Sequence, residues 1–279
     1  MSARKGKLLN QIGFYIFAVV FMITIAFPFL WQILNSLKAL DELYCIPPLW
    51  IPTKLTIQSY VEAFTREPFL LYIKNSAIIA IGTTIISLIC GSLAAYSLAR
   101  LKIKGKKLIL MLILAVTLFP PIIILNPLFL IMRELHLLNT YWGLMLVNTT
   151  FGLPMAIWFL TGFFETIPSE LEEAALIDGA TLLQAFRKII LPLVAPGTFT
   201  VGILVFITAW NQYLFALVFN TRVERRTVTV GITMYQTQYH IPWGTIAAAS
   251  VVITIPLIIM VLLLQKRIVS GLLTGGVKG

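Results

Sequence analysis

The residue types that carry out catalysis are sparse in this chain and do not converge. Its two histidines, His136 and His240, lie more than 100 positions apart, and neither Cys45 nor Cys90 has a CxxC partner. Acid–base chemistry and metal binding both need such groups at fixed spacing, so neither is indicated. A phosphate loop would need the order G-x-x-x-x-G-K-[ST], which the nearest approximation, residues 271–278, lacks. We therefore expect no catalytic residue, no metal and no bound cofactor in this chain.

Acidic residues, in contrast, gather in one place. Five of the eleven lie between Glu165 and Asp178, within a segment, residues 165–197, that is highly ordered for a connection. Two interpretations fit this segment: a helix pair lying on the membrane surface, or a docking element for a cytoplasmic protein. Anionic lipid headgroups would repel the acidic residues, so docking is favoured.

The pattern of this segment predicts two short helices. Both helix starts show the S/T-x-x-E/Q spacing of a capping box: Ser169 with Glu172, and Thr181 with Gln184. Gly179 follows the first helix, at a position where a left-handed turn favours glycine. Pro192 is expected to end the second helix, because proline has no backbone N–H to donate.

The elements around this segment are membrane spans. Charged residues make up 11% of the 279 residues and apolar residues 59%, whereas a soluble domain carries about 25% charged residues. Six continuously apolar stretches free of charge are each long enough to cross a bilayer as a helix. The fold class is therefore an all-α integral membrane protein with six transmembrane helices. We expect them near residues 12–34, 72–99, 108–132, 142–164, 194–219 and 245–265.

The basic residues indicate the orientation of the spans. An even number of spans places both termini on one side, and 13 of the 21 Lys and Arg residues lie on that side. Five of them crowd the link between the second and third spans. The positive-inside rule therefore predicts that both termini, and residues 165–197, are cytoplasmic.

Polar side chains within the spans are candidates for contact with a transported solute. Apart from Lys74 near the start of the second, the six spans contain no charged residue, which disfavours ion-coupled transport through intramembrane carboxylates. Amides can hydrogen-bond sugar hydroxyl groups, and aromatic faces can pack on their C–H surfaces. The alternative role is hydrogen bonding between helices. The candidate residues are Asn148, Trp210, Asn211 and Tyr213.

One run of residues resembles a family signature. Its spacing is that of the permease subunits of bacterial ABC importers, and the matching positions are Glu173, Ala174, Ala175, Gly179, Ile189, Leu191 and Pro192. Residues 92–107, 137–144 and 271–279, and the pair Trp210-Asn211, look like the carbohydrate-importer branch. Within that branch the chain is most similar to the maltose-type second permease subunit.

This resemblance implies a fold and a set of partners. The fold would be that of a type I ABC importer permease, a transport subunit rather than an enzyme, in the bacterial cytoplasmic (inner) membrane. Such subunits work with a second homologous permease, two ATPase subunits that bind ATP and Mg, and an extracytoplasmic sugar-binding protein. No nucleic-acid partner is implied.

The resemblance also implies roles for particular residues. The matching positions, together with Asp178, would form a coupling-helix pair, residues 165–192, that seats in an ATPase subunit. The end of the chain would reach between the two ATPase subunits through Gly275, Gly276 and Lys278.

We accordingly divide the chain into three parts. Residues 1–70 contain the N-terminal segment, the first span and an external loop, residues 71–268 form a five-helix permease core, and residues 269–279 form a cytoplasmic tail. The expected substrate is a di- or oligosaccharide or a related glycoside. A secondary carrier, or a permease for a non-sugar solute such as glycerol phosphate, is the alternative.

Overall fold

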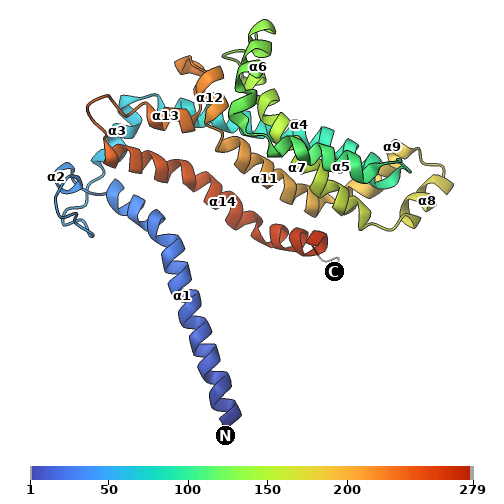
Figure 1. Ribbon diagram of the computed structural model, residues 1–279, viewed down its shortest axis with the longest axis horizontal. Coiled ribbons are helices and arrows are strands. Elements are labelled where there is room, and N and C mark those ends of the chain that lie inside the picture. The colour runs from blue at the N-terminus through green and yellow to red at the C-terminus, as the bar shows by residue number, and fades with distance from the viewer. Residues whose placement is uncertain (1, 277–279) are drawn as a thin grey trace. The chain divides into compact units, whose positions relative to one another are not determined.

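The computed structural model describes residues 2–276, and the side chains of residues 11–265. Within that range the secondary structure is helical, apart from an isolated bridge between Lys38 and Leu55. Figure 1 shows the helices, which in chain order are α1 (Ser2–Ser36), α2 (Leu40–Leu43), α3 (Gln58–Arg66), α4 (Phe69–Arg100), α5 (Lys106–Ala115), η1 (Val116–Leu118), α6 (Pro121–Glu134), α7 (Tyr141–Glu165), α8 (Glu170–Ile177), α9 (Leu182–Ala185), η2 (Phe186–Ile190), α10 (Leu191–Leu193), α11 (Ala195–Trp210), α12 (Leu214–Phe219), η3 (Val223–Arg225), α13 (Val228–Thr233) and α14 (Trp243–Gly276).

Four of the predicted spans correspond to continuous helices that are long and apolar enough to cross a membrane. They lie in α1, α4, α7 and α14. Two further spans exist within the described residues if each of two bent helix pairs counts as one crossing. Counted in this way the described residues contain up to six crossings, although the first half of the second pair, Leu182–Leu193, precedes the fifth predicted span.

The third predicted span is bent at its proline pair. The helical segments Lys106–Leu118 and Pro121–Glu134 meet at an angle of 92°. Phe119 is extended, with φ −72° and ψ 129°, because the ring of a following proline disfavours the helical conformation. Pro121 then opens α6, where its missing N–H costs nothing. The span predicted near 108–132 is therefore not one straight helix but a bent pair.

The fifth predicted span is interrupted near its C-terminal end. α11 stops at Trp210, and helix resumes only at Leu214. Asn211 donates from its side-chain Nδ2 to the carbonyl oxygen of Ile207 at 2.9 Å, and such local bonds compete with helix propagation. At its other end, α11 makes a 77° bend with the segment Leu182–Leu193. The prediction of a single helix over 194–219 is therefore wrong.

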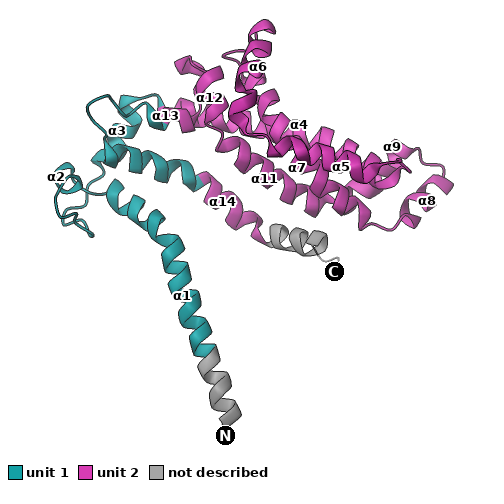
Figure 2. Ribbon diagram, viewed as in Figure 1, with its two compact units in different colours: residues 1–68, 232–255 teal, residues 69–231, 256–279 magenta. Residues whose placement is uncertain are grey.

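The chain forms two compact units, which Figure 2 colours separately. Unit 1 comprises residues 1–68 and 232–255, and unit 2 comprises residues 69–231 and 256–279. In unit 1, α3 is tied to the C-terminal part of the unit. The Tyr235 hydroxyl donates to the Ala63 carbonyl at 2.5 Å, and Thr245 Oγ1 donates to the Glu62 carboxylate at 2.9 Å.

The core of unit 2 is built from α4, α7 and α11. α4 and α7 run parallel and in close contact, because Gly82 faces Met145 and Gly91 faces Ala156. A methyl group at Gly91 would lie 3.0 Å from Ala156 Cβ, and Gly152 makes a similarly close approach to α11. Small residues at such crossings let membrane helices pack backbone to backbone. The buried apolar cluster comprises Ala95, Ala156, Leu160, Phe163, Phe164, Phe186, Ile190, Val194, Val201 and Val205.

Candidate functional site

The segment of residues 165–192, called loop 165–192 below, begins with α8. Three acidic residues lie in the first turn of this helix, where they favour the positive end of the helix dipole. Ser169 precedes α8 but makes no side-chain cap hydrogen bond. The predicted capping box between Ser169 and Glu172 is therefore wrong, because the Glu172 side chain is used elsewhere.

The turn after α8 is set by glycine, as predicted. Gly179 has φ +86°. The backbone N–H of Gly179 donates to Leu176 at 3.1 Å and that of Ala180 donates to Ala175 at 3.0 Å, which is the pairing of a Schellman motif. A Cβ at Gly179 would meet no atom within 4 Å. The glycine is thus required by backbone conformation and not by lack of space.

The second half of the loop starts with the predicted capping box. Thr181 N–H donates to Gln184 Oε1 at 2.8 Å, and Gln184 N–H donates to Thr181 Oγ1 at 3.3 Å. Pro192, however, does not end this helix, which runs on to Leu193 through the π-helical turn η2. In a π-helical turn each backbone N–H bonds to the carbonyl five residues earlier, instead of four. This change in pairing comes just before Pro192, whose nitrogen has no hydrogen to donate.

The inner face of the loop is attached to α4 and α7. Glu172 accepts a short hydrogen bond from the Tyr96 hydroxyl, and its Oε2 lies 3.2 Å from Arg100 Nε. The Arg100 and Glu172 side chains are only 12% and 10% exposed. The Phe186 ring lies 4.8 Å from the Tyr96 ring and 6.1 Å from the Phe164 ring. Sequence reasoning missed this role of Tyr96 and Arg100 and assigned Glu172 to a cap.

The outer face of the loop combines acidic and apolar side chains. Among the predicted coupling residues, Glu173, Ala174, Asp178, Gly179 and Pro192 are exposed, Ile189 and Leu191 are half-buried, and Ala175 is buried. Exposed apolar side chains lie beside the acids: Leu171, Leu176, Ile177, Leu182 and Leu183. Exposed apolar groups in such a cluster are typical of an interaction surface.

The predicted solute-contacting residues do not form one site. Asn148 and Trp210 are buried, at 5% and 2% exposure. Asn148 lines a small cavity with residues of α7 and α11, but Trp210, Asn211 and Tyr213 do not line it. Trp210 stacks on Phe206, and the Tyr213 side chain is 40% exposed. Of the predicted tail residues, Gly275 and Gly276 continue α14, and Lys278 lies outside the described residues.

Asn75 is a polar residue that sequence reasoning did not single out. Its side chain is fully buried, and its Nδ2 donates to the carbonyl oxygens of Glu224 and Arg226 at 3.1 and 2.8 Å. The signal was available, since an amide in an apolar run must find partners. Asn75 attaches the segment around η3 to α4.

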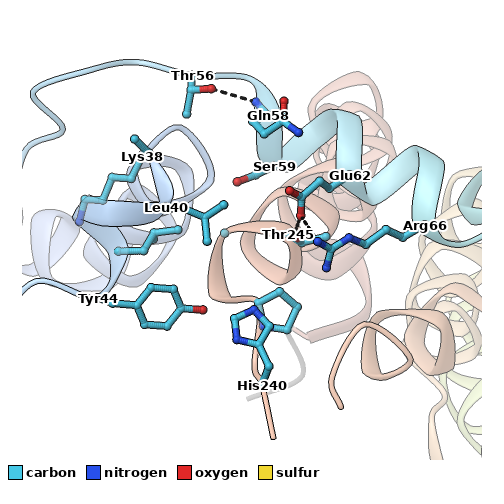
Figure 3. Close-up of a pocket in the computed structure, with 14 residues that line it drawn as sticks. Lys38, Leu40, Tyr44, Thr56, Gln58, Ser59, Glu62, Arg66, His240 and Thr245 are labelled. Carbon is cyan, nitrogen blue, oxygen red and sulfur yellow. Dashed lines mark hydrogen bonds and ion pairs between the residues drawn. The ribbon is translucent and has the colours of Figure 1, made fainter.

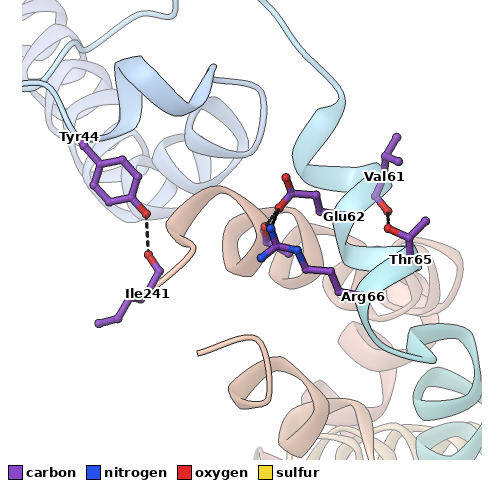
Figure 4. Close-up of polar contacts among 7 residues, drawn as sticks. Tyr44, Val61, Glu62, Thr65, Arg66 and Ile241 are labelled. Atoms are coloured by element: carbon purple, nitrogen blue, oxygen red, sulfur yellow. Dashed lines mark hydrogen bonds and ion pairs between the residues drawn. The ribbon is translucent and has the colours of Figure 1, made fainter. Parts of the chain in front are cut away.

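Unit 1 contains a pocket of about 330 Å³ that is lined by both polar and apolar residues, shown in Figure 3. Tyr44 and His240 both line it, and their ring centroids lie 6.0 Å apart. Glu62 pairs with Arg66 at 3.1 Å, and the Tyr44 hydroxyl donates to the Ile241 carbonyl at 2.7 Å, as Figure 4 shows. Lys38 also lines the pocket, and its burial lowers its pKa, partly opposed by the charge of Glu42.

Comparisons with known proteins agree with the geometry. Residues 87–273 match the family described as "Binding-protein-dependent transport system inner membrane component". The sulfoquinovosyl glycerol transport system permease protein SmoH of Agrobacterium fabrum is 44% identical over 265 residues, covering 95% of this chain and 93% of SmoH. The trehalose/maltose transport system permease protein MalG of Thermococcus litoralis is 42% identical over 278 residues, or 99% of both chains.

Solved structures show the same fold. A chain of a bacterial ABC transporter that imports the acidic polysaccharide alginate superposes with a TM-score of 0.77 at 23% identity, over 92% of this chain and 96% of that one. A chain of the MetNI methionine ABC transporter superposes with a TM-score of 0.55 at 17% identity, over 74% and 98%. The chain therefore belongs to the binding-protein-dependent inner membrane components and is a multi-pass permease of the ABC importer type, not an enzyme.

Proposed function

We propose that this permease forms half of the translocation pathway of an ATP-driven sugar importer, and that loop 165–192 couples ATPase closure to movement of the spans. One observation carries the proposal. The outer face of the loop is acidic and apolar and exposed, whereas its inner face is bound to α4 through Glu172. A segment that is ordered on one side and open on the other is suited to transmit the motion of a partner.

The proposed partners follow from the family. A second, homologous permease would complete the pathway, two ATPase subunits would bind ATP and Mg on the cytoplasmic side, and an extracytoplasmic binding protein would deliver the solute. Within this chain we assign ATPase contact to the predicted coupling residues: Glu173, Ala174, Ala175, Asp178, Gly179, Ile189, Leu191 and Pro192. The C-terminal tail, residues 269–279, would reach between the ATPase subunits.

The proposed substrate is a di- or oligosaccharide or a related glycoside. The relatives that support it are named for sulfoquinovosyl glycerol, for trehalose and maltose, and for trehalose. Span residues such as Asn211 and Tyr213 would offer hydroxyl-binding and aromatic groups to such a solute. Glycerol phosphate is disfavoured because these three relatives are all named for glycosides.

We further propose that both termini and loop 165–192 face the cytoplasm. In this orientation the link between α4 and α5, with its cluster of basic residues, is cytoplasmic as well. The permease core would then span residues 71–268, and residues 38–68 would lie outside the membrane.

The test is reconstitution of the complete importer with variants of the loop. We expect Glu173→Lys to abolish copurification of the ATPase subunits, because it reverses a charge on the exposed face. Gly179→Pro should do the same, because φ +86° is inaccessible to proline. The readouts are ATPase copurification and ATP-driven uptake of [14C]trehalose into proteoliposomes.

Glu134→Lys is the matched control. Glu134 is an exposed acidic residue at the end of α6, on the opposite side of the membrane in the proposed orientation. Its reversal should leave copurification at the wild-type level. If Glu173→Lys and Gly179→Pro both retain ATPase binding and uptake, the coupling role of the loop is refuted.

A further inference from the structure

Loop 165–192 is attached to the membrane helices by a cluster of polar groups buried beneath α8. Glu172 receives the Tyr96 hydroxyl hydrogen bond and pairs with Arg100, although Tyr96 and Glu172 are 76 positions apart in the chain. Glu172 lies in the first turn of α8, whereas Tyr96 and Arg100 lie one turn apart at the end of α4. This cluster is called the α8–α4 clamp below.

The clamp differs in kind from the second ion pair of this region. Lys106 and Glu165 also form an ion pair, but their side chains are 27% and 38% exposed. Pairs exposed to solvent contribute little. Removal of one partner from a buried pair leaves an uncompensated charge and is far more disruptive. The two pairs therefore provide an internal comparison.

The clamp connects the exposed face of α8, which a partner protein can contact, to the packed helices of unit 2. Ile177 on α8 is 86% exposed, whereas Ala175 on the same helix is 6% exposed. α4 in turn packs tightly on α7, where Gly91 meets Ala156. The Phe186 ring adds a second contact by packing on Tyr96. A displacement of α8 can therefore reach the packed helices directly through α4.

We infer that Glu172 is a positioning residue that makes α8 and α4 move as one body during transport. This inference rests on the proposed function of loop 165–192. Glu172 contacts neither ATP nor the solute, and it acts through Tyr96 and Arg100. When the clamp is broken, the ATPase subunits can still bind and move α8, but α4 no longer follows fully.

The first test measures coupling in the reconstituted importer. Glu172→Gln should raise the ATP hydrolysed per [14C]trehalose taken up on the order of tenfold, as expected for loss of a charged hydrogen-bonded contact. ATPase copurification should stay at the wild-type level. Tyr96→Phe should raise the same ratio less, and the Tyr96→Phe/Glu172→Gln double variant should be no worse than Glu172→Gln alone, because both act on one contact. Lys106→Gln is the matched control and should change the ratio less than twofold.

The second test does not depend on the sugar. Spin labels at Leu93→Cys on α4 and Glu170→Cys on α8, both exposed positions, report the distance between the two helices in a Cys45→Ser/Cys90→Ser background. With the clamp intact, we expect the same distance distribution with and without a non-hydrolysable ATP analogue. In the Glu172→Gln variant, addition of the analogue should shift or broaden the distance distribution.

The outcomes separate the inference from the proposed function. If no ATPase subunit copurifies with the wild-type chain, the proposed function fails. If ATPase binding and uptake are normal, but Glu172→Gln changes neither the coupling ratio nor the distance distribution, the inference alone is overturned. A loss of copurification in Glu172→Gln would also overturn it, because Glu172 would then shape the docking surface itself.

Discussion

The Tyr141 hydroxyl, at the start of α7, donates a 2.7 Å hydrogen bond to Oδ1 of Asn75 on α4. Asn75 uses its other side-chain atom to bind two backbone carbonyls of the segment around η3. One buried amide therefore joins three parts of unit 2 that are distant in the sequence. An apolar residue in its place would remove all three of these hydrogen bonds.

Asn75→Ala should consequently destabilise the permease. We expect a loss of about 2 to 4 kcal/mol, since each buried polar group left unpaired costs about 1–3 kcal/mol. Thermal unfolding of the detergent-solubilised complex measures it. Thr150→Ala on the adjacent helix removes only an intrahelical bond at an exposed site and should change stability by less than about 0.5 kcal/mol. Equal stabilities of the two variants would contradict the role of Asn75.

Gly179→Ala should loosen loop 165–192 without unfolding the rest. A left-handed conformation costs a non-glycine residue about 1–2 kcal/mol, so amide hydrogen exchange in α8 should accelerate by about tenfold. Gly162→Ala is the control, because Gly162 lies within α7 and a Cβ there would meet no atom within 4 Å. That change should be neutral or slightly stabilising. Unchanged exchange in Gly179→Ala would show that α8 is not held by this turn.

The proposed orientation places Cys45 outside the membrane. Cys45 and Cys90 are both free and exposed, but Cys90 lies within α4, one of the candidate membrane spans. A membrane-impermeant maleimide should therefore label a Cys90→Ser variant from outside in right-side-out vesicles. Labelling only after permeabilisation would reverse the assigned topology.

The proposed contact between the solute and residues 211–213, between α11 and α12, can be tested with exposed residues alone. We expect Asn211→Ala and Tyr213→Ala each to raise KM for [14C]trehalose about three- to tenfold, as for loss of one hydrogen bond or ring contact. Trp210→Ala is unsuitable, because Trp210 is buried and its truncation would cost about 3–5 kcal/mol. Wild-type KM in both variants would exclude this site.

The number of spans could be predicted from charge-free apolar stretches, because a bilayer imposes a minimum length on each. The same reasoning could not locate the breaks. Hydropathy is nearly uniform across residues 108–132, whereas the bend depends on the backbone at Phe119. Likewise, the break between Trp210 and Leu214 contains neither a charged residue nor a proline.

Local signals in loop 165–192 succeeded where their partners are close in sequence. The Thr181–Gln184 box and the Gly179 turn are both closed within a few residues. Glu172 has the same local signal as Gln184, but a long-range contact with Arg100 and Tyr96 takes its carboxylate instead. Residue spacing alone cannot predict that a distant side chain will bind a group that could otherwise cap its own helix.

The π-helical turn between Phe186 and Ile190 limits insertions and deletions in this part of the loop. A π turn contains one residue more than an α-helical turn over the same path. Deletion of any one of these residues would restore regular α-helical pairing and place the Pro192 ring against the carbonyl four residues before it. Insertions and deletions should therefore be excluded from this stretch, even though much of its surface is open to solvent.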